Sequence, residues 1–268
     1  MTDQALTKEQ SQVVRVKTAN KIAIITMNRP KAMNALNQDM VNQLLCTLQE
    51  VENDPIIRTV ILTGEGRAFS AGGDLEYISS ITDPIAARNF ISEVGEIVTR
   101  IMTMKKPVIA MVNGVAAGAG FNLALACDIV FCAESARFAQ SFVKVGLIPD
   151  CGGLYLLPRI VGMHKAKELM FTADLIHAQK ALELNIINKI FADAELESKT
   201  VAFAEQLTNG APIALSMVKS MVNRSGNLDL ASVLELESDL QTICMQTEDH
   251  KEGVKAFKEK RLPVFHGK

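Results

Sequence analysis

The sequence predicts an α/β fold with a helical C-terminal region. Short apolar segments typical of buried strands alternate with amphipathic segments at helical spacing over the first 200 residues. Beyond about residue 154 the pattern is mostly helical, and no stretch rich in Pro, Gly or Ser separates two parts of the chain. We therefore expect an α/β core over residues 1–200 and a helical region over residues 201–268, packed on the core or on a neighbouring molecule.

Three strands and one helix are predicted at the start of the core. The segments "VVRVK" (13–17) and "KIAIITM" (21–27) are two strands joined by a turn, and "RTVILTG" (58–64) is a buried strand. Asp39 is placed to cap the helix between them. The apolar face of that helix consists of Met40, Val41, Leu44, Leu45, Leu48 and Val51.

A second round of strands and helices follows. A helix is expected around residues 85–102, and Pro107 then precedes the strand "VIAMV" (108–112). Its apolar face is predicted from Ile85, Phe90, Ile91, Val94, Ile97, Val98 and Ile101. Further short strands are "DIVFCA" (128–133), "ARFAQ" (136–140) and "IINKIF" (186–191), and helical spacing returns over 230–260 with Leu230, Val233, Leu234, Leu240 and Ile243.

The composition is that of an ordinary globular protein, with 48% hydrophobic and 22% charged residues. The 28 basic and 30 acidic residues give a net charge of −2, so we expect no nucleic-acid partner. The polar N-terminus "MTDQALTKEQSQ" has no signal-peptide pattern, and no apolar run approaches the roughly 20 residues that span a membrane. We expect a cytoplasmic protein without a membrane partner, with about ten frayed residues at its start.

Motifs for several common kinds of site are absent from the sequence. It contains no G-x-x-x-x-G-K-[ST], no H-E-x-x-H and no G-x-G-x-x-G, and "AFSAG" (68–72) lacks the first glycine of a nucleophile elbow. The four histidines lie in polar contexts that favour surface roles. No two of the five cysteines form a C-x-x-C pair, and we interpret them as buried free thiols without a metal or redox role. They are Cys46, Cys127, Cys132, Cys151 and Cys244.

Two loops of small residues follow buried strands. One belongs to "VILTGEGRAFSAGGDL" (60–75) and the other to "VIAMVNGVAAGAGFNLALA" (108–126). Each leaves backbone N–H groups uncovered, and two such groups that converge on one point form an oxyanion hole, which a helix N-terminus strengthens. Close packing of helix on sheet is the structural alternative for each loop taken alone.

Five motifs taken together resemble the enoyl-CoA hydratase/isomerase family, the crotonases, over nearly the whole chain. The resemblance implies a spiral of β-β-α units with a helical C-terminal region that trimerises, and trimers that often pair into hexamers. It also implies a coenzyme A thioester whose carbonyl lies between the N–H groups of Ala71 and Ala119, where the enolate is stabilised. The motifs are "NRPKAMNAL" (28–36), "RAFSAGGDL" (67–75), "NGVAAGAGFNLALACD" (113–128), "LIPDCGGLYLLPRIVG" (147–162) and "EGVKAFKEKR" (252–261).

The same resemblance implies a binding site for coenzyme A, which is part of the substrate, so that no separate cofactor is expected. A lysine near a phosphate is physically reasonable because its ammonium group pairs with the phosphate charge. On sequence alone Lys260 is equally a residue of a solvated helix face. The residues implied are Lys31, Ala32 and Asn34, the segment Ala71, Gly72, Gly73, Asp74 and Leu75, and, from a neighbouring subunit, Phe257 and Lys260.

The sequence departs from the hydratases of the family at their two glutamates. Asn122 and Phe142 stand at those positions, and neither side chain can transfer a proton. A phenyl ring would also displace a water molecule, so a two-glutamate hydration mechanism is disfavoured. Asn122 is expected instead to hydrogen-bond the acyl chain or an ordered water.

Asp150, in "GLIPDCGG", aligns with the acid/base of isomerase-type members. Its apolar neighbours are expected to raise its pKa toward the range useful for a general base. The alternative is that Asp150 caps the helix beginning near Gly153. Asp74 and Asp128 fit capping and turn roles better, and Glu134 is a distant candidate.

One carboxylate is sufficient to move a proton between C2 and C4 of an enoyl thioester, so enoyl-CoA isomerisation through Asp150 is the function that the sequence favours. Isomerases of phenylacetate-derived thioesters use similar steps. A hydratase or other lyase of fatty-acid or aromatic-acid degradation is the first alternative. A coenzyme-A-binding scaffold without activity is the second.

Overall fold

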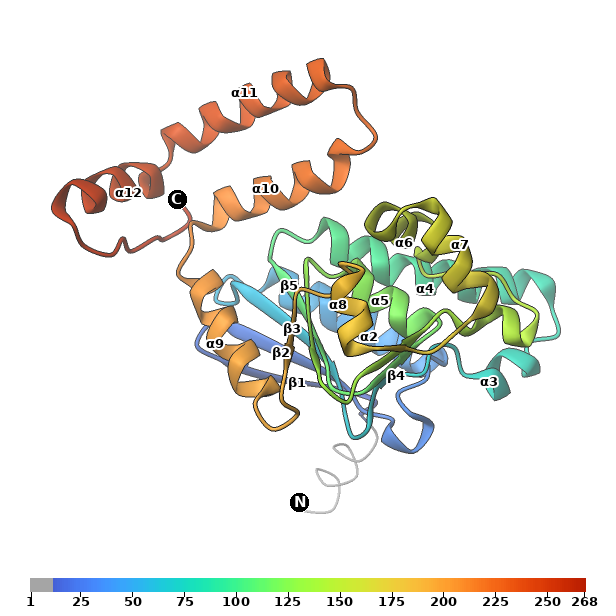
Figure 1. The fold of residues 1–268 in the computed structure, drawn as a ribbon. Helices are drawn as coiled ribbons and strands as arrows, with labels where there is room; N and C mark the ends of the chain where they lie inside the picture. The colour runs from blue at the N-terminus through green and yellow to red at the C-terminus, as the bar shows by residue number, and fades with distance from the viewer. Residues whose placement is uncertain (1–11) are drawn as a thin grey trace, which may run out of the picture.

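The computed structural model describes residues 12–268, and the N-terminal residues that we expected to fray lie outside the described part. Two sheets form the core (Figure 1). The larger has the strand order β1-β2-β3-β5-β7-β10 and is parallel except for the β1–β2 hairpin. Its strands are β1 (Val14–Ala19), β2 (Ile22–Met27), β3 (Thr59–Gly64), β5 (Val108–Val112), β7 (Ile129–Ala133) and β10 (Lys189–Phe191).

The second sheet is smaller and has the order β4-β6-β8-β9, with only the last pair antiparallel. The chain visits the larger sheet, then the smaller sheet, then a helix, and repeats this path as β3-β4-α3, β5-β6-α5 and β7-β8-α6. The predicted spiral of β-β-α units is thereby confirmed. The new elements are β4 (Ala68–Ser70), β6 (Val115–Ala117), β8 (Arg137–Ala139), β9 (Ile176–His177), α3 (Leu75–Ser80), α5 (Ala119–Ala126) and α6 (Gly153–Val161).

Two long helices, α2 (Gln38–Asn53) and α4 (Pro84–Thr103), pack on each other and bury most of their predicted apolar faces. The predicted cap of α2 is wrong, because the side chain of Asn37, not that of Asp39, accepts the Met40 N–H at 3.1 Å. In α4 the predicted core residues Ile85 and Ile91 are exposed. Helical spacing placed them on the buried stripe, but α4 packs on α2 and α5 through other residues of that stripe, and Ile91 faces a cavity.

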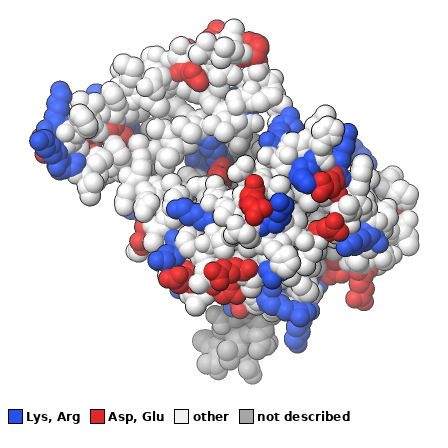
Figure 2. All heavy atoms as spheres, viewed as in Figure 1, with Lys and Arg blue, Asp and Glu red and all other residues white. Residues whose placement is uncertain are grey.

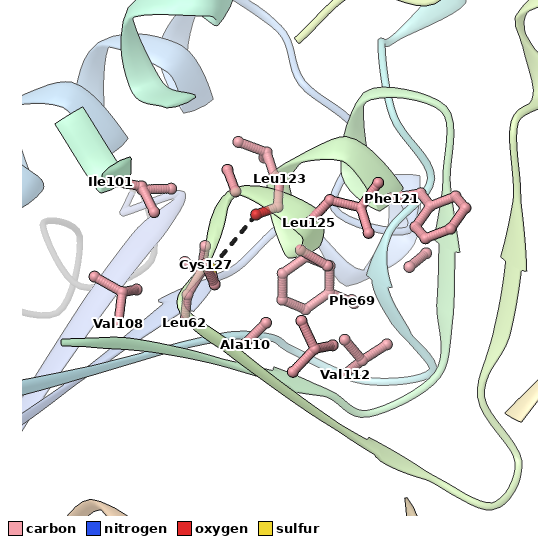
Figure 3. Packing of buried hydrophobic residues seen from close by; sticks show 14 of the residues in the cluster. Leu62, Phe69, Ile101, Val108, Ala110, Val112, Phe121, Leu123, Leu125 and Cys127 are labelled. Atoms are coloured by element: carbon pink, nitrogen blue, oxygen red, sulfur yellow. Dashed lines mark hydrogen bonds between the residues drawn. The ribbon is translucent and has the colours of Figure 1, made fainter. Parts of the chain in front are cut away.

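Helix α5 lies within the core, and every one of its residues is buried. Phe69, Ala110 and Val112, from β4 and β5, belong with Leu123 and Leu125 of α5 to one cluster of buried hydrophobic residues (Figure 3). Because α5 is apolar apart from Asn122, its burial between other elements is favourable. Its first residue, Ala119, lies directly after the smaller sheet, because only Gly118 separates α5 from β6.

The C-terminal helices form an arm that projects from the core (Figure 1). Helix α9 (Leu196–Thr208) spans the boundary expected at residue 200 and packs on β3, β5 and β7, and the arm begins after it. No helix in residues 12–268 is both long and apolar enough to cross a membrane. The arm comprises α10 (Pro212–Ser225), α11 (Leu230–Gln246) and α12 (Glu248–Glu259), and the remaining helices are α7 (Met163–Thr172), α8 (Ala178–Glu183) and the short 3-10 turns η1 (Pro30–Ala32) and η2 (Ser141–Val145).

Candidate active site

A cavity of about 630 Å³ opens where the two small-residue loops meet. Its walls come from η1, from α3 and the loop before it, from α4, from the start of α5, and from the segment 141–150. Most of its lining is apolar, and the charged residues in it are Asp74, Lys144 and Asp150. Such a concave apolar site with few polar groups is typical of a small-molecule site.

The small residues allow the two loops to touch. A Cβ at Gly72, whose φ is +95°, would lie 2.7 Å from the Ala117 carbonyl oxygen and 3.1 Å from the Ala119 nitrogen. A Cβ at Gly120 would lie 2.3 Å from the carbonyl oxygen of Ser70. The packing explanation is therefore correct for these glycines, and this packing brings the Ala119 N–H to the other loop.

Ala119 is the first residue of α5 and lines the cavity. Its N–H has no acceptor among residues 12–268, as is usual for the first N–H groups of a helix. The partial positive charge of the helix N-terminus adds to the attraction that this N–H exerts on an anion. The structure thus leaves the Ala119 donor available, as the oxyanion-hole prediction requires.

The prediction that the N–H of Ala71 is the second donor of the oxyanion hole is wrong. This N–H donates to the Met33 carbonyl at 2.9 Å, and the Gly72 N–H donates to the hydroxyl of Ser70 at 3.2 Å. The Asp74 N–H is bonded to the Leu36 carbonyl at 2.9 Å. Between them, the N–H of Gly73 has no acceptor in the described part of the chain, and Gly73 lines the cavity. Gly73 was predicted only to bind coenzyme A. Its position directly before the cap residue Asp74 was the feature of the sequence that could have identified it as a donor.

Asp150 lies in the loop before α6 and lines the cavity next to the oxyanion-hole loops. Burial raises the pKa of its carboxyl to about 6, as expected, against a smaller lowering effect of a backbone hydrogen bond. Its buried Oδ1 has no hydrogen-bond partner in residues 12–268. The capping alternative is not realised, because Gly152 is the N-cap of α6 and no side chain bonds the first turn. The carboxyl group is therefore free to transfer a proton.

Asn122 is fully buried on α5 and does not line the cavity, so the expected contact with substrate is wrong. Its Nδ2 donates to the main-chain carbonyl of Asp150 at 2.8 Å, and its Oδ1 accepts from Nε2 of Gln140 at 2.7 Å. Phe142 does line the cavity, and its ring lies beside Gly118, where an added Cβ would be 3.6 Å from Cζ.

The residues expected to border coenzyme A divide into two groups. Ala32, Ala71, Gly73, Asp74 and Leu75 line the cavity, whereas Lys31, exposed on η1, and Gly72, held between the loops, do not.

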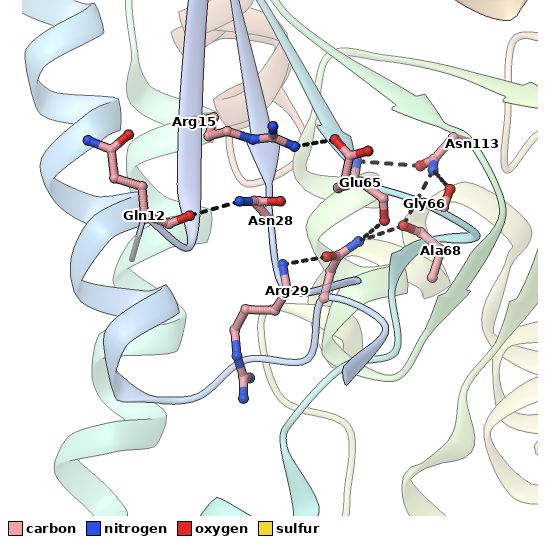
Figure 4. A network of polar contacts seen from close by, with 10 residues as sticks. Gln12, Arg15, Asn28, Arg29, Glu65, Gly66, Ala68 and Asn113 are labelled. Atoms are coloured by element: carbon pink, nitrogen blue, oxygen red, sulfur yellow. Dashed lines mark hydrogen bonds and ion pairs between the residues drawn. The ribbon is translucent and has the colours of Figure 1, made fainter. Parts of the chain in front are cut away.

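Asn34 cannot bind coenzyme A, contrary to the prediction, because it is buried and its amide is already used. The Asn34 Oδ1 accepts the Arg29 N–H at 2.9 Å, and its Nδ2 donates to the carbonyls of Glu65 and Ala68 at 3.0 and 2.7 Å. The network around Arg29, Glu65 and Ala68 also includes Asn113 (Figure 4). Asn34 therefore shapes the loop that ends at the cavity.

Asp74 caps α3, as expected, by accepting the Tyr77 N–H at 3.2 Å, and it pairs with Arg29 at 3.0 Å. Burial acts to raise the pKa of this carboxyl, but the Tyr77 N–H and the Arg29 guanidinium together hold it below its ordinary value. Asp74 is therefore a structural anion in the cavity wall, unlike Asp150.

Phe257 and Lys260 lie on the arm, away from this cavity. Phe257 is 86% exposed, and Lys260 is the residue in the left-handed conformation that ends α12. Basic side chains gather at this end of the arm, and most of its visible face is uncharged (Figure 2). Contact of these two residues with a neighbour's ligand stays a prediction.

Comparison with known proteins gives consistent matches over nearly the whole chain. The family model described as enoyl-CoA hydratase/isomerase matches residues 17–268. The chain is 39% identical over 242 residues to a short-chain-enoyl-CoA hydratase of Clostridium acetobutylicum, covering 90% of this chain and 92% of that protein. It is also 39% identical over 252 residues to a 1,2-epoxyphenylacetyl-CoA isomerase of Escherichia coli, covering 92% and 95%. A crystal structure of an enoyl-CoA hydratase from Bacillus anthracis superimposes with a TM-score of 0.92 at 33% identity, covering 96% of this chain and all of that one.

Proposed function

The chain belongs to the enoyl-CoA hydratase/isomerase family of enzymes, and from this premise we propose that it is an acyl-CoA isomerase that shifts a double bond through Asp150. One observation carries the proposal. Asp150 is the carboxyl group in the cavity wall that has a buried oxygen without a partner, whereas the carboxyl of Asp74 is held by Arg29.

The thioester carbonyl is expected to accept hydrogen bonds from the N–H groups of Ala119 and Gly73. Both groups lack an acceptor among residues 12–268 and both residues line the cavity. When a proton leaves the carbon next to the carbonyl, negative charge moves onto the carbonyl oxygen. Two fixed donors stabilise this charged state more than the neutral thioester and so lower the barrier.

Asp150 transfers the proton. Its carboxylate removes a proton from C2 of a 3-enoyl thioester, because the carbonyl acidifies that carbon, and the electron pair of the broken C–H bond enters a dienolate. The protonated Asp150 then returns the proton to C4, and the double bond comes to lie between C2 and C3, in conjugation with the thioester. No water and no further reactant are consumed.

The cavity wall supports an apolar acyl group. Leu75, Ile78, Ile91, Val145, Leu147 and Ile148 lie in this wall, and all of them expose apolar surface that a hydrocarbon chain or ring would cover. The exposure of Ile91, which contradicted its predicted place in the core, is consistent with a role in this wall.

Hydration is the second candidate, favoured by the similarity to a hydratase. It requires groups that hold and activate a water molecule. Asn122 is bonded to Gln140 and to the Asp150 carbonyl, and Phe142 presents a ring to the cavity, so neither is suited to this task.

Two substrates distinguish these functions when the absorbance of the conjugated enoyl thioester is followed. With a 3-enoyl-CoA we expect the absorbance to rise, and with a 2-enoyl-CoA we expect it to stay constant. A fall with the 2-enoyl-CoA would establish hydration instead. Absence of change with both, together with calorimetric binding of a saturated acyl-CoA, would indicate a scaffold.

The rate of isomerisation is expected to depend on pH through Asp150. The base must be deprotonated to accept the C2 proton, and burial raises the pKa of its carboxyl to about 6. Consequently kcat should rise as pH increases from 5 to 7, with a midpoint near 6, and measurement of initial rates across this range checks it. A kcat already constant down to pH 4.5 would contradict catalysis by a base with this raised pKa.

We also propose that the arm packs on further copies of the chain, as a trimer or hexamer. Large apolar side chains on all three helices of the arm are more than half exposed, among them Val222, Leu230 and Phe257. An arm of this kind buries its apolar surface only when it meets another surface. In such an assembly Phe257 and Lys260 would reach a neighbour's coenzyme A.

A further inference from the structure

We propose that Asn122, oriented by Gln140, is a positioning residue that fixes the direction of the Asp150 carboxylate by holding the main-chain carbonyl of the same residue. The inference rests on the proposed function in one respect, namely that Asp150 is the proton carrier. Asn122 stands where a glutamate of the hydratases was expected, and it does not contact the cavity.

The Asp150 carbonyl oxygen accepts two hydrogen bonds. One comes from Nδ2 of Asn122 at 2.8 Å and the other from the N–H of Gly153 at 2.9 Å. The first ties the loop to α5, the helix that carries the Ala119 donor, and the second closes the turn before α6. Two donors on one carbonyl limit the rotation of the Asp150 peptide, and therefore the direction in which its side chain leaves the main chain.

The Asp150 carbonyl and Gln140 together hold the Asn122 amide in one orientation. The Gln140 Nε2 donates to the Asn122 Oδ1 at 2.7 Å, and both side chains are buried. If the Asn122 amide were reversed, its oxygen would face the Asp150 carbonyl and its NH₂ group would face the Gln140 NH₂ group. Both contacts would be repulsive, so the three groups allow one arrangement.

The space around the Asn122 amide is closed by Gly153. A Cβ at Gly153 would lie 2.3 Å from Nδ2 and 2.6 Å from Cγ of Asn122. The amide therefore lies directly against the main chain of Gly153. This contact leaves the Asn122 side chain little room to change rotamer, which is what a positioning residue requires.

An amide is the chemical group that this position needs. It supplies one donor for a carbonyl and one acceptor for an NH₂ group, and the asparagine side chain is similar in size to that of leucine. An aspartate would present oxygen to the Asp150 carbonyl and bring a second negative charge to the loop. The other ionisable groups near Asp150 are Cys151 and, in the cavity wall, Asp74 and Lys144. Burial raises the pKa of the Cys151 thiol and so keeps this group neutral.

The test replaces Asn122 by leucine, which has a similar shape and no hydrogen bonds. We expect Asn122→Leu to lower kcat for a 3-enoyl-CoA about 10²-fold with KM unchanged, because misplacement of a catalytic group affects the transition state. The released loop should also let water reach the Asp150 carboxyl, so the pKa of this group should fall from about 6 toward 3.8. Carbon-13 NMR follows this pKa, and the Asp150→Asn variant identifies the signal. A purely structural role would lower Tm alone.

Asn223→Leu is the matched control. The Asn223 Nδ2 also donates to a main-chain carbonyl, that of Met102 at 2.9 Å, but on α10, outside the cavity wall. The Asn223→Leu variant should have a lower Tm than the wild-type protein but the same kcat and the same Asp150 pKa. If Asn122→Leu does not fold, Gln140→Met is expected to show the same two effects at smaller size.

The outcomes separate the inference from the proposed function. If the wild-type protein converts the 3-enoyl-CoA and a folded Asn122→Leu or Gln140→Met protein has the same kcat, the positioning role is overturned and the function stands. If the wild-type protein is inactive but the Asp150 pKa falls in the variants, the positioning role stands and the function is overturned.

Discussion

Replacement of Asp150 by asparagine is expected to lower kcat for the isomerisation of a 3-enoyl-CoA by roughly 10²–10⁴-fold, the usual contribution of general acid–base catalysis. Asparagine keeps the size of the side chain and removes the proton carrier. No other carboxyl group in the cavity wall can take over, because Asp74 pairs with Arg29 and caps α3. Initial rates from the absorbance of the conjugated product measure the effect.

Binding provides the control for this prediction. Asp150→Asn should bind a saturated acyl-CoA as the wild-type protein does in calorimetry, because the N–H groups of Ala119 and Gly73 are unchanged. A variant that binds normally and retains a third or more of the wild-type kcat would exclude Asp150 as the base. In that case Lys144 would be the next ionisable group of the cavity wall to test.

The fold could be predicted from local pattern to a large extent. Segments such as 108–112 are apolar throughout and become fully buried strands, since both faces of a parallel sheet are covered. Helix ends were less predictable, because Asn37 and Asp39 are both good caps and the tertiary path of the chain selects Asn37. Ile85 and Ile91 continue the apolar stripe of α4, but both are exposed, and local pattern does not show which turns of a helix its neighbours cover.

The candidate site was predictable where its chemistry depends on residue type. It was unpredictable where its chemistry depends on which groups are hydrogen-bonded to each other. Asp150 and Ala119 could be named because the motifs that contain them resemble those of the enoyl-CoA hydratase/isomerase family, and because a carboxyl group and a small residue at a helix start suit the implied roles. The choice between Ala71 and Gly73 depends on hydrogen bonds to Met33 and Leu36, about 40 residues away in the sequence, which local pattern does not encode. The same holds for Asn34 and Asn122, whose amides are used by distant main-chain groups.

These corrections have a common physical basis. In the proposed site the reacting groups are main-chain N–H groups and the Asp150 carboxyl, so the side chains around them act by holding the main chain. Asn34 holds the loop after β3, and Asn122 holds the loop before α6. Buried amides suit this task because each supplies a donor and an acceptor without a charge.

Replacement of Lys219 by methionine is expected to lower the free energy of unfolding by about 3 kcal/mol, the lower end of the range for breaking a buried ion pair. Lys219, on α10, lies 2.8 Å from Asp128, and their side chains are 6% and 20% exposed. Its Nζ also donates to the Lys106 carbonyl at 3.0 Å, so this ammonium group of the arm binds two groups of the core. Methionine keeps the alkyl chain but leaves the Asp128 carboxylate without its cation.

The double variant Lys219→Met with Asp128→Asn isolates the electrostatic part. Asparagine is neutral and its oxygen can still accept the Val108 N–H, which Asp128 now accepts at 2.7 Å, so the double variant should be more stable than Lys219→Met alone. The chain has no tryptophan, so urea unfolding is best followed by circular dichroism, at one protein concentration because association would shift the midpoint. A loss below about 0.5 kcal/mol in Lys219→Met, the range of ordinary surface substitutions, would show that the arm is held to the core by its apolar contacts and not by this ion pair.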